Sequence, residues 1–371
     1  MTKLKSDDDS GYLRLLGWDD RRQAEAEAIG GEDFVFGRVA VEHREQYLLL
    51  TAAGERTAEV SGHFLFRAEA PADFPKVGDW VAATDFPDEE KAIIHAVLPR
   101  RAVLSRNTAG RRTEEQVLAA NIDTIFLVQG LDHDFNVRRL ERQTVSARAS
   151  GAETVLILNK ADLVADTADH LRRIRGVLPS LEILTVSALS GSGIEGLRRR
   201  LRPAETHVLL GSSGVGKSTL INALIGRDVL ATAPVREDDS RGRHTTARRE
   251  LIVLDGGALL VDTPGVREFQ LWDSEEGMDA VFGDIAALAS GCRFGDCTHT
   301  RESGCAVLAA REAGTLPEDR YQSWLKLRKE LAYLETKKRE KPGADKKEWS
   351  KEIQGALKTF RKINPKARFR G

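Results

Sequence analysis

The residues best suited to chemistry in this chain form a glycine-rich loop that ends in lysine and serine. The run Gly-Ser-Ser-Gly-Val-Gly-Lys-Ser occupies residues 211–218, directly after the apolar stretch His207–Leu210 and at the start of a helical pattern. Glycines let backbone N–H groups curl around a phosphate, while Lys217 can reach the β- and γ-oxygens and Ser218 can ligate Mg²⁺. The loop predicts a nucleoside triphosphate site that consists of Gly211, Ser212, Ser213, Gly214, Val215, Gly216, Lys217, Ser218 and Thr219.

The tetrapeptide Asn-Lys-Ala-Asp at residues 159–162 predicts which base the nucleotide carries. It follows the apolar run Val155–Leu158, so it lies at the end of an expected strand. The aspartate can accept hydrogen bonds from N1–H and the N2 amine of guanine, whereas adenine would leave it unpaired. A serine and an alanine that end a second apolar run resemble the loop whose backbone amide contacts guanine O6. Both segments favour GTP over ATP, and their residues are Asn159, Lys160, Ala161, Asp162, Ser187 and Ala188.

Two more segments are suited to the γ-phosphate and its metal ion. Asp262 ends an apolar run and opens the motif Asp-Thr-Pro-Gly. Its carboxylate can hold Mg²⁺ through water, and the backbone amide of Gly265 can sense the γ-phosphate. The polar loop Gly-Arg-His-Thr-Thr at residues 242–246 offers two threonines that could complete the Mg²⁺ shell. Thr245 and Thr246 both fit, and we favour Thr246.

Val266 occupies the position at which many GTPases have a glutamine that orients the attacking water. A valine side chain cannot hydrogen-bond to water, so another group must position the nucleophile. His244 lies in the loop that is expected to close over the γ-phosphate. We therefore expect His244 and Lys217 to be the catalytic residues; the alternative is that a partner supplies the missing group.

The order of these motifs reverses that of an ordinary GTPase, in which the phosphate loop opens the domain and the base-reading motif closes it. Here the base-reading motif comes first, the phosphate loop second and Asp-Thr-Pro-Gly last. The order predicts a circularly permuted G domain, which is tolerated because domain termini usually lie close together at the surface. Permutation would also attach the C-terminal region directly after Gly265, and we hypothesise that γ-phosphate sensing there pulls on that region.

All three cysteines of the chain lie in one window together with a histidine. Thiolates and an imidazole at this spacing suit tetrahedral Zn²⁺ with no open position, which is a structural site. Scattered cysteines are usually small buried apolar residues, but these are clustered in a glycine-rich loop. A disulfide is not expected from three cysteines in a cytoplasmic protein. The expected ligands are Cys292, Cys297, His299 and Cys305.

Length and composition indicate a globular protein of two or three domains, since the chain has 371 residues, 41% of them apolar and 30% charged. No apolar run is long enough for a membrane helix and the N-terminus does not resemble a signal peptide, so we expect a cytoplasmic location and no membrane partner.

The C-terminal end of the chain is basic. Residues 320–371 contain 17 Lys and Arg against 6 Asp and Glu. This basic end favours a polyanionic partner, which could be RNA, DNA or an acidic protein; the other interpretation is a solvated charged helix.

The residue pattern predicts a multidomain α/β protein. Residues 1–31 look peripheral, and residues 32–105 contain about five short stretches of period two, as in an OB-fold β-barrel or, nearly as well, an SH3-like barrel. Residues 106–274 begin with an expected mobile linker at 106–112. They then alternate strands and helices, as in the doubly wound sheet of a P-loop GTPase domain. Residues 275–371 are expected to form an α-helical zinc-binding domain with a basic tail.

Together these features resemble the family of ribosome small-subunit-dependent GTPase A, or RsgA. The permuted motif order, the Cys-x4-Cys-x-His-x5-Cys cluster and the expected barrel carry the resemblance, which extends from about residue 32 to the end of the chain. Ser303 departs from the family, which often has proline at this position. Other matching stretches are Val77–Trp80, Leu98–Arg101, Ala119–Asp123 and Gly242–Thr246.

The resemblance implies a late-acting assembly factor of the small ribosomal subunit. It implies that the barrel and the zinc domain contact ribosomal RNA, that the subunit stimulates GTP hydrolysis, and that a histidine at the position of His244 serves catalysis. We expect a monomer that binds GTP or GDP with Mg²⁺ and holds one Zn²⁺, with a basic tail that adds salt-sensitive phosphate contacts. Two alternatives stay open. One is a GTP-gated rRNA-binding placement factor with incidental hydrolysis, and the other is an RNA-modification GTPase, for which the sequence shows no separate motif for base chemistry.

Overall fold

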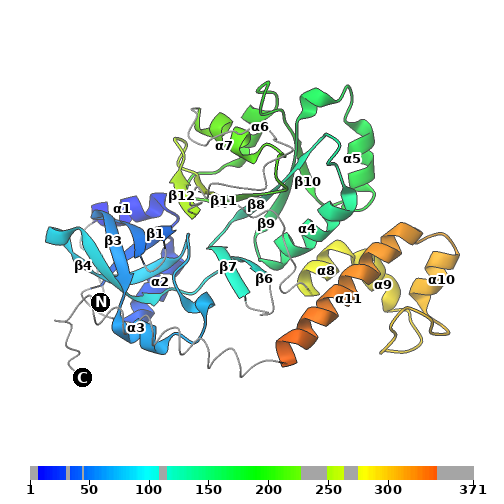
Figure 1. The fold of residues 1–371 in the computed structure, drawn as a ribbon, viewed down its shortest axis with the longest axis horizontal. Helices are drawn as coiled ribbons and strands as arrows, with labels where there is room; N and C mark the ends of the chain where they lie inside the picture. The colour runs from blue at the N-terminus through cyan, green and yellow to red at the C-terminus, as the bar shows by residue number, and fades with distance from the viewer. Residues whose placement is uncertain are drawn as a thin grey trace, which may run out of the picture.

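The computed structural model describes residues 7–30, 34–43, 46–107, 115–226, 249–262 and 275–340. Figure 1 shows a β-barrel in blue and cyan, an α/β region in green and a helical region in yellow and orange. The barrel and the α/β region share one continuous sheet, and the helical region lies against the α/β region.

Five strands close into the barrel, in the order β1-β2-β3-β5-β4 with a further pairing between β4 and β1. β3 and β5 run parallel, whereas the other neighbours are antiparallel. Alternate side chains such as those of Val39, Leu49 and Ile94 fill the interior and are fully buried. This order, with α3 (Gly62–Arg67) between β3 and β4, identifies an OB-fold, so the SH3-like alternative is wrong. The strands are β1 (Val35–His43), β2 (Gln46–Thr51), β3 (Gly54–Val60), β4 (Trp80–Phe86) and β5 (Lys91–Val97); the short helices η1 (Pro71–Asp73) and η2 (Pro87–Glu89) flank β4.

The α/β region contains a sheet with the order β10-β9-β8-β11-β13-β12. Its strands are parallel except β12, which runs antiparallel to β13, and β8, β9 and β11 are buried along most of their length. The doubly wound sheet is thus confirmed. The strands are β8 (Thr124–Gly130), β9 (Glu153–Asn159), β10 (Glu182–Thr185), β11 (Thr206–Leu210), β12 (Arg249–Val253) and β13 (Leu259–Asp262). The helices are α4 (Val137–Ala149), α5 (Ala168–Arg175), α6 (Ile194–Arg200), α7 (Lys217–Ile225) and η3 (Ala161–Leu163).

Circular permutation is visible in the strand order. β9, which ends at the base-reading motif, precedes β11, which ends at the phosphate loop, and β13 with its terminal aspartate comes last. The three strands nevertheless belong to one sheet in which β8 and β11 are neighbours. The motifs therefore meet at the carboxyl ends of these strands, since parallel strands end on the same side of the sheet.

The barrel joins the α/β region through a short antiparallel pairing between β1 and β12. Val41 pairs with Glu250 and Glu42 pairs with Arg249. The carboxylate of Glu42 lies 2.5 Å from Lys76 Nζ and 3.9 Å from Arg249 Nη1. Backbone pairing and the Glu42–Arg249 ion pair connect the barrel to β12.

The N-terminal helices are not peripheral, contrary to the expectation from the sequence. Leu13, Leu16 and Trp18 are buried, and the Trp18 ring packs edge-on against Trp80 of the barrel, with the ring centroids 4.9 Å apart. Gly17 approaches the α/β region so closely that a Cβ atom there would lie 2.8 Å from the Ala204 carbonyl oxygen. α1 (Asp7–Leu15) and α2 (Asp20–Ile29) therefore belong to the junction of the barrel and the α/β region.

A buried arginine holds this junction together. Arg38 of β1 donates hydrogen bonds to the carbonyl oxygens of Leu16 and Gly78 and to Thr206 Oγ1, the last at 2.6 Å. Burial lowers the pKa of Arg38 to about 10, so the guanidinium stays charged at neutral pH. One side chain thus links the N-terminal helices, the barrel and β11.

A hairpin of β6 (Val103–Asn107) and β7 (Glu115–Ala120) connects the barrel to β8. The expected mobile linker overlaps β6, because Arg106 pairs with Gln116 and Asn107 with Glu115. For these residues the prediction of a mobile linker is wrong; residues 108–112 lie outside the described part of the chain.

The C-terminal region consists of helices and packs on α4 (Figure 1). Gly277 lies so close to α4 that a Cβ atom would be 2.1 Å from the Val145 carbonyl oxygen. Arg320 reaches the fully buried Glu141 of α4, with 2.7 Å between Nη1 and Oε1. No helix in the described residues is both long and apolar enough to cross a membrane. The helices are α8 (Glu275–Val281), α9 (Gly283–Ala289), α10 (Ala306–Glu312) and α11 (Glu318–Glu340).

Candidate functional site

The glycine-rich loop connects β11 to α7, as its sequence predicts. Gly214 and Gly216 have φ values of +80° and +93°, a region that disfavours side chains. A Cβ atom on Gly211 would lie 2.3 Å from the Val128 carbonyl oxygen of β8. Glycine is needed at these positions so that the loop can curve tightly against the end of the sheet. The curvature directs backbone N–H groups toward the space at the N-terminus of α7.

Lys217 folds back over this loop. Its ammonium donates hydrogen bonds to the carbonyl oxygens of Gly211 at 2.7 Å and Ser212 at 2.8 Å. Burial lowers the pKa of Lys217 to about 8, while the carboxylate of Asp262 acts in the opposite direction. A largely buried cation held by carbonyl groups is poised to meet an anionic oxygen at the mouth of the loop.

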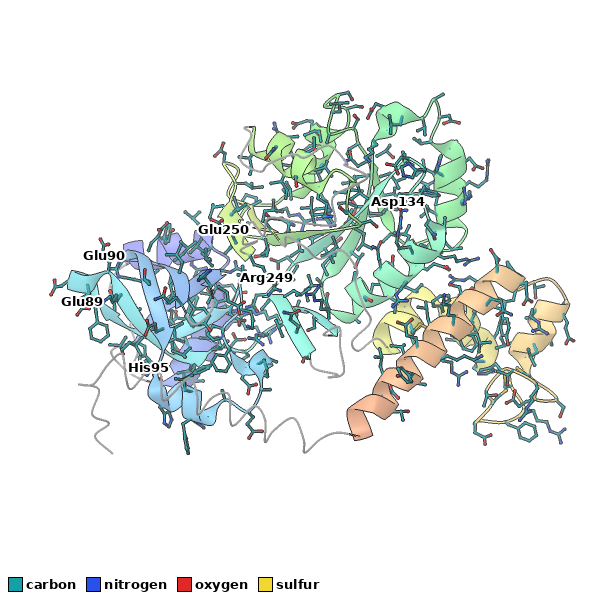
Figure 2. All side chains as sticks on the ribbon, in the orientation of Figure 1. Glu89, Glu90, His95, Asp134, Arg249 and Glu250 are labelled. Atoms are coloured by element: carbon teal, nitrogen blue, oxygen red, sulfur yellow. The ribbon has the colours of Figure 1, made fainter. Side chains whose placement is uncertain are left out.

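Asp262 lies at the end of β13, the neighbour of β11. Burial raises the pKa of its carboxyl group, and the charge of Glu250 raises it further, whereas Lys217 lowers it. Glu250 is the cross-strand partner of Asp262 and is labelled in Figure 2 beside Arg249. Two carboxylates on neighbouring strands repel each other, and a divalent cation with oxygen ligands would relieve that repulsion. Asp262 thus offers a carboxylate oxygen of the kind that Mg²⁺ prefers, and Glu250, which the sequence motifs did not single out, adds negative charge beside it.

Asn159 joins the base-reading motif to the phosphate loop. Its Nδ2 donates to the Val215 carbonyl oxygen at 2.9 Å, and its Oδ1 accepts from the Ala188 N–H at 3.0 Å. A Cβ atom on Gly216 would lie 2.4 Å from Asn159 Nδ2, so this glycine also makes room for the asparagine. A single buried amide thus holds together three loops that lie far apart in the sequence.

The adjoining residues place the aspartate of the motif. Lys160 has φ +63° and forms an ion pair with Asp132, with 2.6 Å between Nζ and Oδ2. Ser187 Oγ donates a hydrogen bond to Oδ1 of the exposed Asp162. Because only Oδ1 takes part in that bond, Oδ2 can accept from guanine. The sequence motifs did not identify Asp132 as a site residue. Its position shortly after β8 was the only feature of the sequence that could have indicated this role.

The structure thus brings together the predicted residues of 159–162, 187–188 and 211–219 with Asp262. His244, Thr245, Thr246, Gly265 and Val266 lie outside the described residues, so their predicted roles stay predictions.

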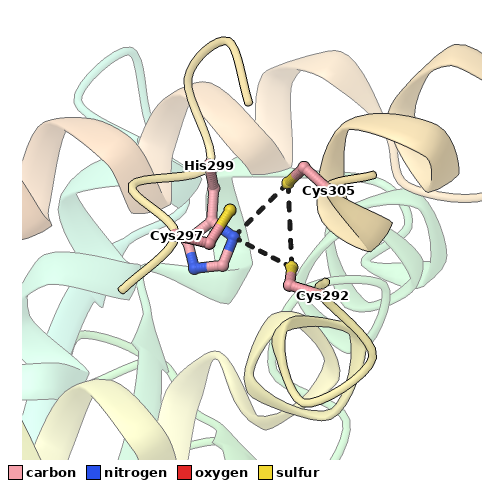
Figure 3. Close-up of side chains that lie close together, drawn as sticks. All are labelled: Cys292, Cys297, His299 and Cys305. Carbon is pink, nitrogen blue, oxygen red and sulfur yellow. Dashed lines mark hydrogen bonds between the residues drawn. The ribbon is translucent and has the colours of Figure 1, made fainter. Parts of the chain in front are cut away.

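The three cysteines and His299 converge on one point (Figure 3). Their ligand atoms all lie within 4.8 Å of one another. Cys292 Sγ lies 3.4 Å from His299 Nδ1 and 3.8 Å from Cys305 Sγ, and Cys305 Sγ lies 3.5 Å from the same nitrogen. Tetrahedral Zn²⁺, with bonds of about 2.3 Å to sulfur and 2.0 Å to nitrogen, would separate sulfurs by about 3.8 Å and sulfur from nitrogen by about 3.5 Å. The spacing fits a metal centre with four protein ligands.

The polypeptide around this cluster holds the ligands in place. His299 has φ +60°, and its carbonyl oxygen accepts a hydrogen bond from Tyr321 Oη of α11 at 2.8 Å. Trp324 packs edge-on against the imidazole, with 5.5 Å between the ring centroids. The cluster is therefore built into the packing of α11, and its four protein ligands leave no open position, as is usual for a structural metal site.

Replacing Cys292 with serine is expected to abolish stoichiometric zinc binding and to lower the thermal midpoint of the C-terminal region, because a structural metal contributes directly to folding. Zinc content is measured by elemental analysis, and thermal unfolding of the C-terminal region by limited proteolysis over a series of temperatures. Removing zinc from the unsubstituted protein with a chelator should lower the midpoint in the same way. A variant that keeps one zinc per chain and an unchanged midpoint would show that Cys292 is not a ligand.

Comparisons with known proteins agree with this arrangement. Residues 97–272 match the family model described as RsgA GTPase. The chain is similar to the small ribosomal subunit biogenesis GTPase RsgA of Opitutus terrae, with 46% identity over 92% of this chain and 96% of that protein. It is also similar to the crystal structure of YjeQ from Thermotoga maritima, with a TM-score of 0.60, 27% identity, and coverage of 81% of this chain and 99% of that one. The structure of YloQ, a circularly permuted GTPase, has a TM-score of 0.56 at 22% identity, covers 84% of this chain and 97% of its own, and supports the fold.

Proposed function

Because the chain belongs to the RsgA GTPase family, we propose that it hydrolyses GTP to GDP and phosphate and acts in late maturation of the small ribosomal subunit. One observation carries the proposal: a protein named as a small ribosomal subunit biogenesis GTPase is 46% identical over 92% of this chain. The buried Asn159, which joins the phosphate loop to the base-reading loops, supports guanine nucleotides as the ligand. We further propose that the subunit stimulates hydrolysis, as the sequence resemblance implies.

The site residues then divide into three roles. Lys217 and the loop at residues 211–219 bind the phosphates, and residues 159–162 with Ser187 and Ala188 bind guanine. Ser218, Thr246 and Asp262 would hold Mg²⁺, which supplies charge neutralisation at the β- and γ-oxygens. The Gly265 amide would sense the γ-phosphate.

Hydrolysis needs a group that orients water, and Val266 cannot do so. We assign this task to His244, whose imidazole can hydrogen-bond to a water molecule beside the γ-phosphate. Lys217 stabilises the charge that develops on the phosphate oxygens.

The remaining assignments concern the metal cluster, the location and oligomeric state of the protein, and its contact with ribosomal RNA. Cys292, Cys297, His299 and Cys305 would hold one structural Zn²⁺, because their spacing fits its tetrahedral geometry. We also propose a cytoplasmic monomer whose basic residues beyond Arg320 contact ribosomal RNA through its phosphates.

Sedimentation with purified small and large subunits tests the proposed function, in GDP or in a non-hydrolysable GTP analogue. We expect the chain to pellet with small subunits in the GTP-like state and to remain in the supernatant with large subunits. GTP turnover, measured with and without small subunits, should rise in their presence. Binding without stimulation would favour the GTP-gated placement factor, and an absence of binding to small subunits would contradict both.

A further inference from the structure

The two ends of the OB-fold barrel differ in charge. The turn from β4 to β5 carries Asp88, Glu89 and Glu90, with the exposed Phe86 beside them. Figure 2 labels Glu89 and Glu90 at one end of the barrel and His95 at the other. OB-folds often bind oligonucleotides with the loops between strands one and two and between strands four and five. Here the second of these loops is acidic and repels phosphate.

The opposite end is formed by α3, which displays an aromatic and a basic side chain. Phe64 and Leu65 pack against the barrel core, and the Phe64 ring contacts Phe74 edge-on at 5.7 Å. Phe66 points the other way and is 83% exposed, and the next residue, Arg67, is also exposed. Packing of the two inward residues holds the backbone of the outward pair in place, which lowers the entropic cost of binding.

A groove of about 410 Å³ runs beside α3 and contains Arg67 and His95. The imidazole of His95 stacks on Phe34, with 5.1 Å between ring centroids and 22° between planes, and its Nε2 lies 2.9 Å from Thr84 Oγ1. The groove thus has a rigid aromatic wall. Its volume lies within the range of about 300–1,000 Å³ that is usual for ligand pockets.

Two of the carboxylates near this groove already have hydrogen-bond or ion-pair partners. Asp73 accepts hydrogen bonds from the backbone N–H groups of Glu69 and Ala70, at 2.7 and 2.9 Å. Asp79 is fully buried in an ion pair with Arg100, with 2.7 Å between Oδ2 and Nη2. Arg67, in contrast, has no ion-pair partner among the residues that the structure describes. Its charge is available to an anionic ligand.

We propose that Phe66, Arg67 and His95 form a patch, here called the α3 patch, that binds single-stranded RNA. An unpaired base stacks on Phe66 and a neighbouring phosphate contacts Arg67, a combination that is usual for single-strand binding. The exposed ring and the free cation favour RNA over an apolar protein partner. The inference rests on the proposed function, because ribosomal RNA is then the available ligand, and it assigns the α3 end of the barrel to that contact.

Phe66→Ala is expected to weaken binding of a short fluorescein-labelled single-stranded RNA by about fivefold to a hundredfold, because one stacked base is lost. Arg67→Ala should lower the slope of log K against log salt concentration by about 0.7, the value for one phosphate of a single strand. Phe86→Ala removes an exposed ring at the acidic end and should leave the affinity unchanged. Fluorescence anisotropy gives the affinities, and equal thermal midpoints show that the variants fold.

Two outcomes would overturn the inference. RNA affinity could be unchanged in Phe66→Ala, or it could fall as far in Phe86→Ala as in Phe66→Ala. A loss of small-subunit sedimentation in Phe66→Ala at unchanged RNA affinity would assign the patch to a protein surface. The proposed function is tested separately by sedimentation of the unsubstituted chain, so its failure is distinguishable from a failure of this inference.

Discussion

Replacing Glu141 with alanine is expected to lower the free energy of unfolding of the C-terminal helices by about 3–5 kcal/mol. The Glu141 side chain has no solvent exposure and accepts from Arg320, Arg138 and Ser323, all at distances of 2.7 to 2.9 Å. Alanine leaves the buried guanidinium of Arg320 with the half-exposed Asp284 as its only carboxylate partner among the described residues. Asp284 is half-exposed and offsets the charge of Arg320 less well than the buried Glu141 does, so α11 should pack less firmly on α4.

The measurement is urea unfolding followed by amide hydrogen exchange in α11, together with limited proteolysis of the C-terminal region. Asp319→Ala is the matched control, because Asp319 forms an ion pair with Arg138 on the same face but is largely exposed. That change should cost less than about 1 kcal/mol, as exposed ion pairs do. Equal stability of the two variants would show that the Glu141–Arg320 pair does not hold the regions together.

The same variant bears on the hypothesis that γ-phosphate sensing pulls on the C-terminal region. Pulling requires this region to move relative to α4, and the Glu141–Arg320 pair opposes that motion. If the hypothesis is correct, Glu141→Ala should change how strongly small-subunit binding depends on the nucleotide. If small-subunit binding depends on the nucleotide to the same degree in this variant, the hypothesis is wrong, and the permuted motif order reflects only the evolutionary history of the chain.

Replacing His244 with alanine is expected to lower the rate of GTP hydrolysis by about a hundredfold or more, in line with the usual contribution of a positioned catalytic side chain. The reason is that Val266 offers no hydrogen bond to the attacking water, so His244 has no substitute nearby in the motif. The affinity for GTP should stay the same, because we assign the binding of the phosphates to Lys217 and the loop around it. Single-turnover hydrolysis and equilibrium binding of a labelled nucleotide give the two quantities.

His244→Gln is the matched variant for this prediction. A glutamine can orient water, as it does in other GTPases, so it should recover part of the lost rate while alanine does not. If His244→Ala binds GTP normally and hydrolyses it at the unsubstituted rate, the catalytic role of His244 is wrong, and a group from the partner must orient the water.

The sequence by itself determined the nucleotide loops and the elements that carry them. A phosphate loop needs glycines within a few residues of one another, and Gly214 and Gly216 do adopt the positive φ angles that such a loop requires. The strands before each motif are short apolar runs, and their buried residues lie where the pattern places them, as in β8 and β11. The spacing of Cys292, Cys297, His299 and Cys305 likewise anticipated their convergence.

Only the tertiary structure decided the contacts between segments that lie far apart in the chain. The pairing of Glu250 with Asp262 depends on strand register, and the ion pair of Lys160 with Asp132 depends on two strand ends being neighbours. The N-terminal helices looked peripheral because two short helices show little amphipathic pattern, yet Trp18 is buried at the junction of two other regions. Likewise, nothing near Glu141 in the sequence indicates Arg320. Local patterns encode loops and strands, whereas the burial of a side chain is fixed by every segment that packs around it.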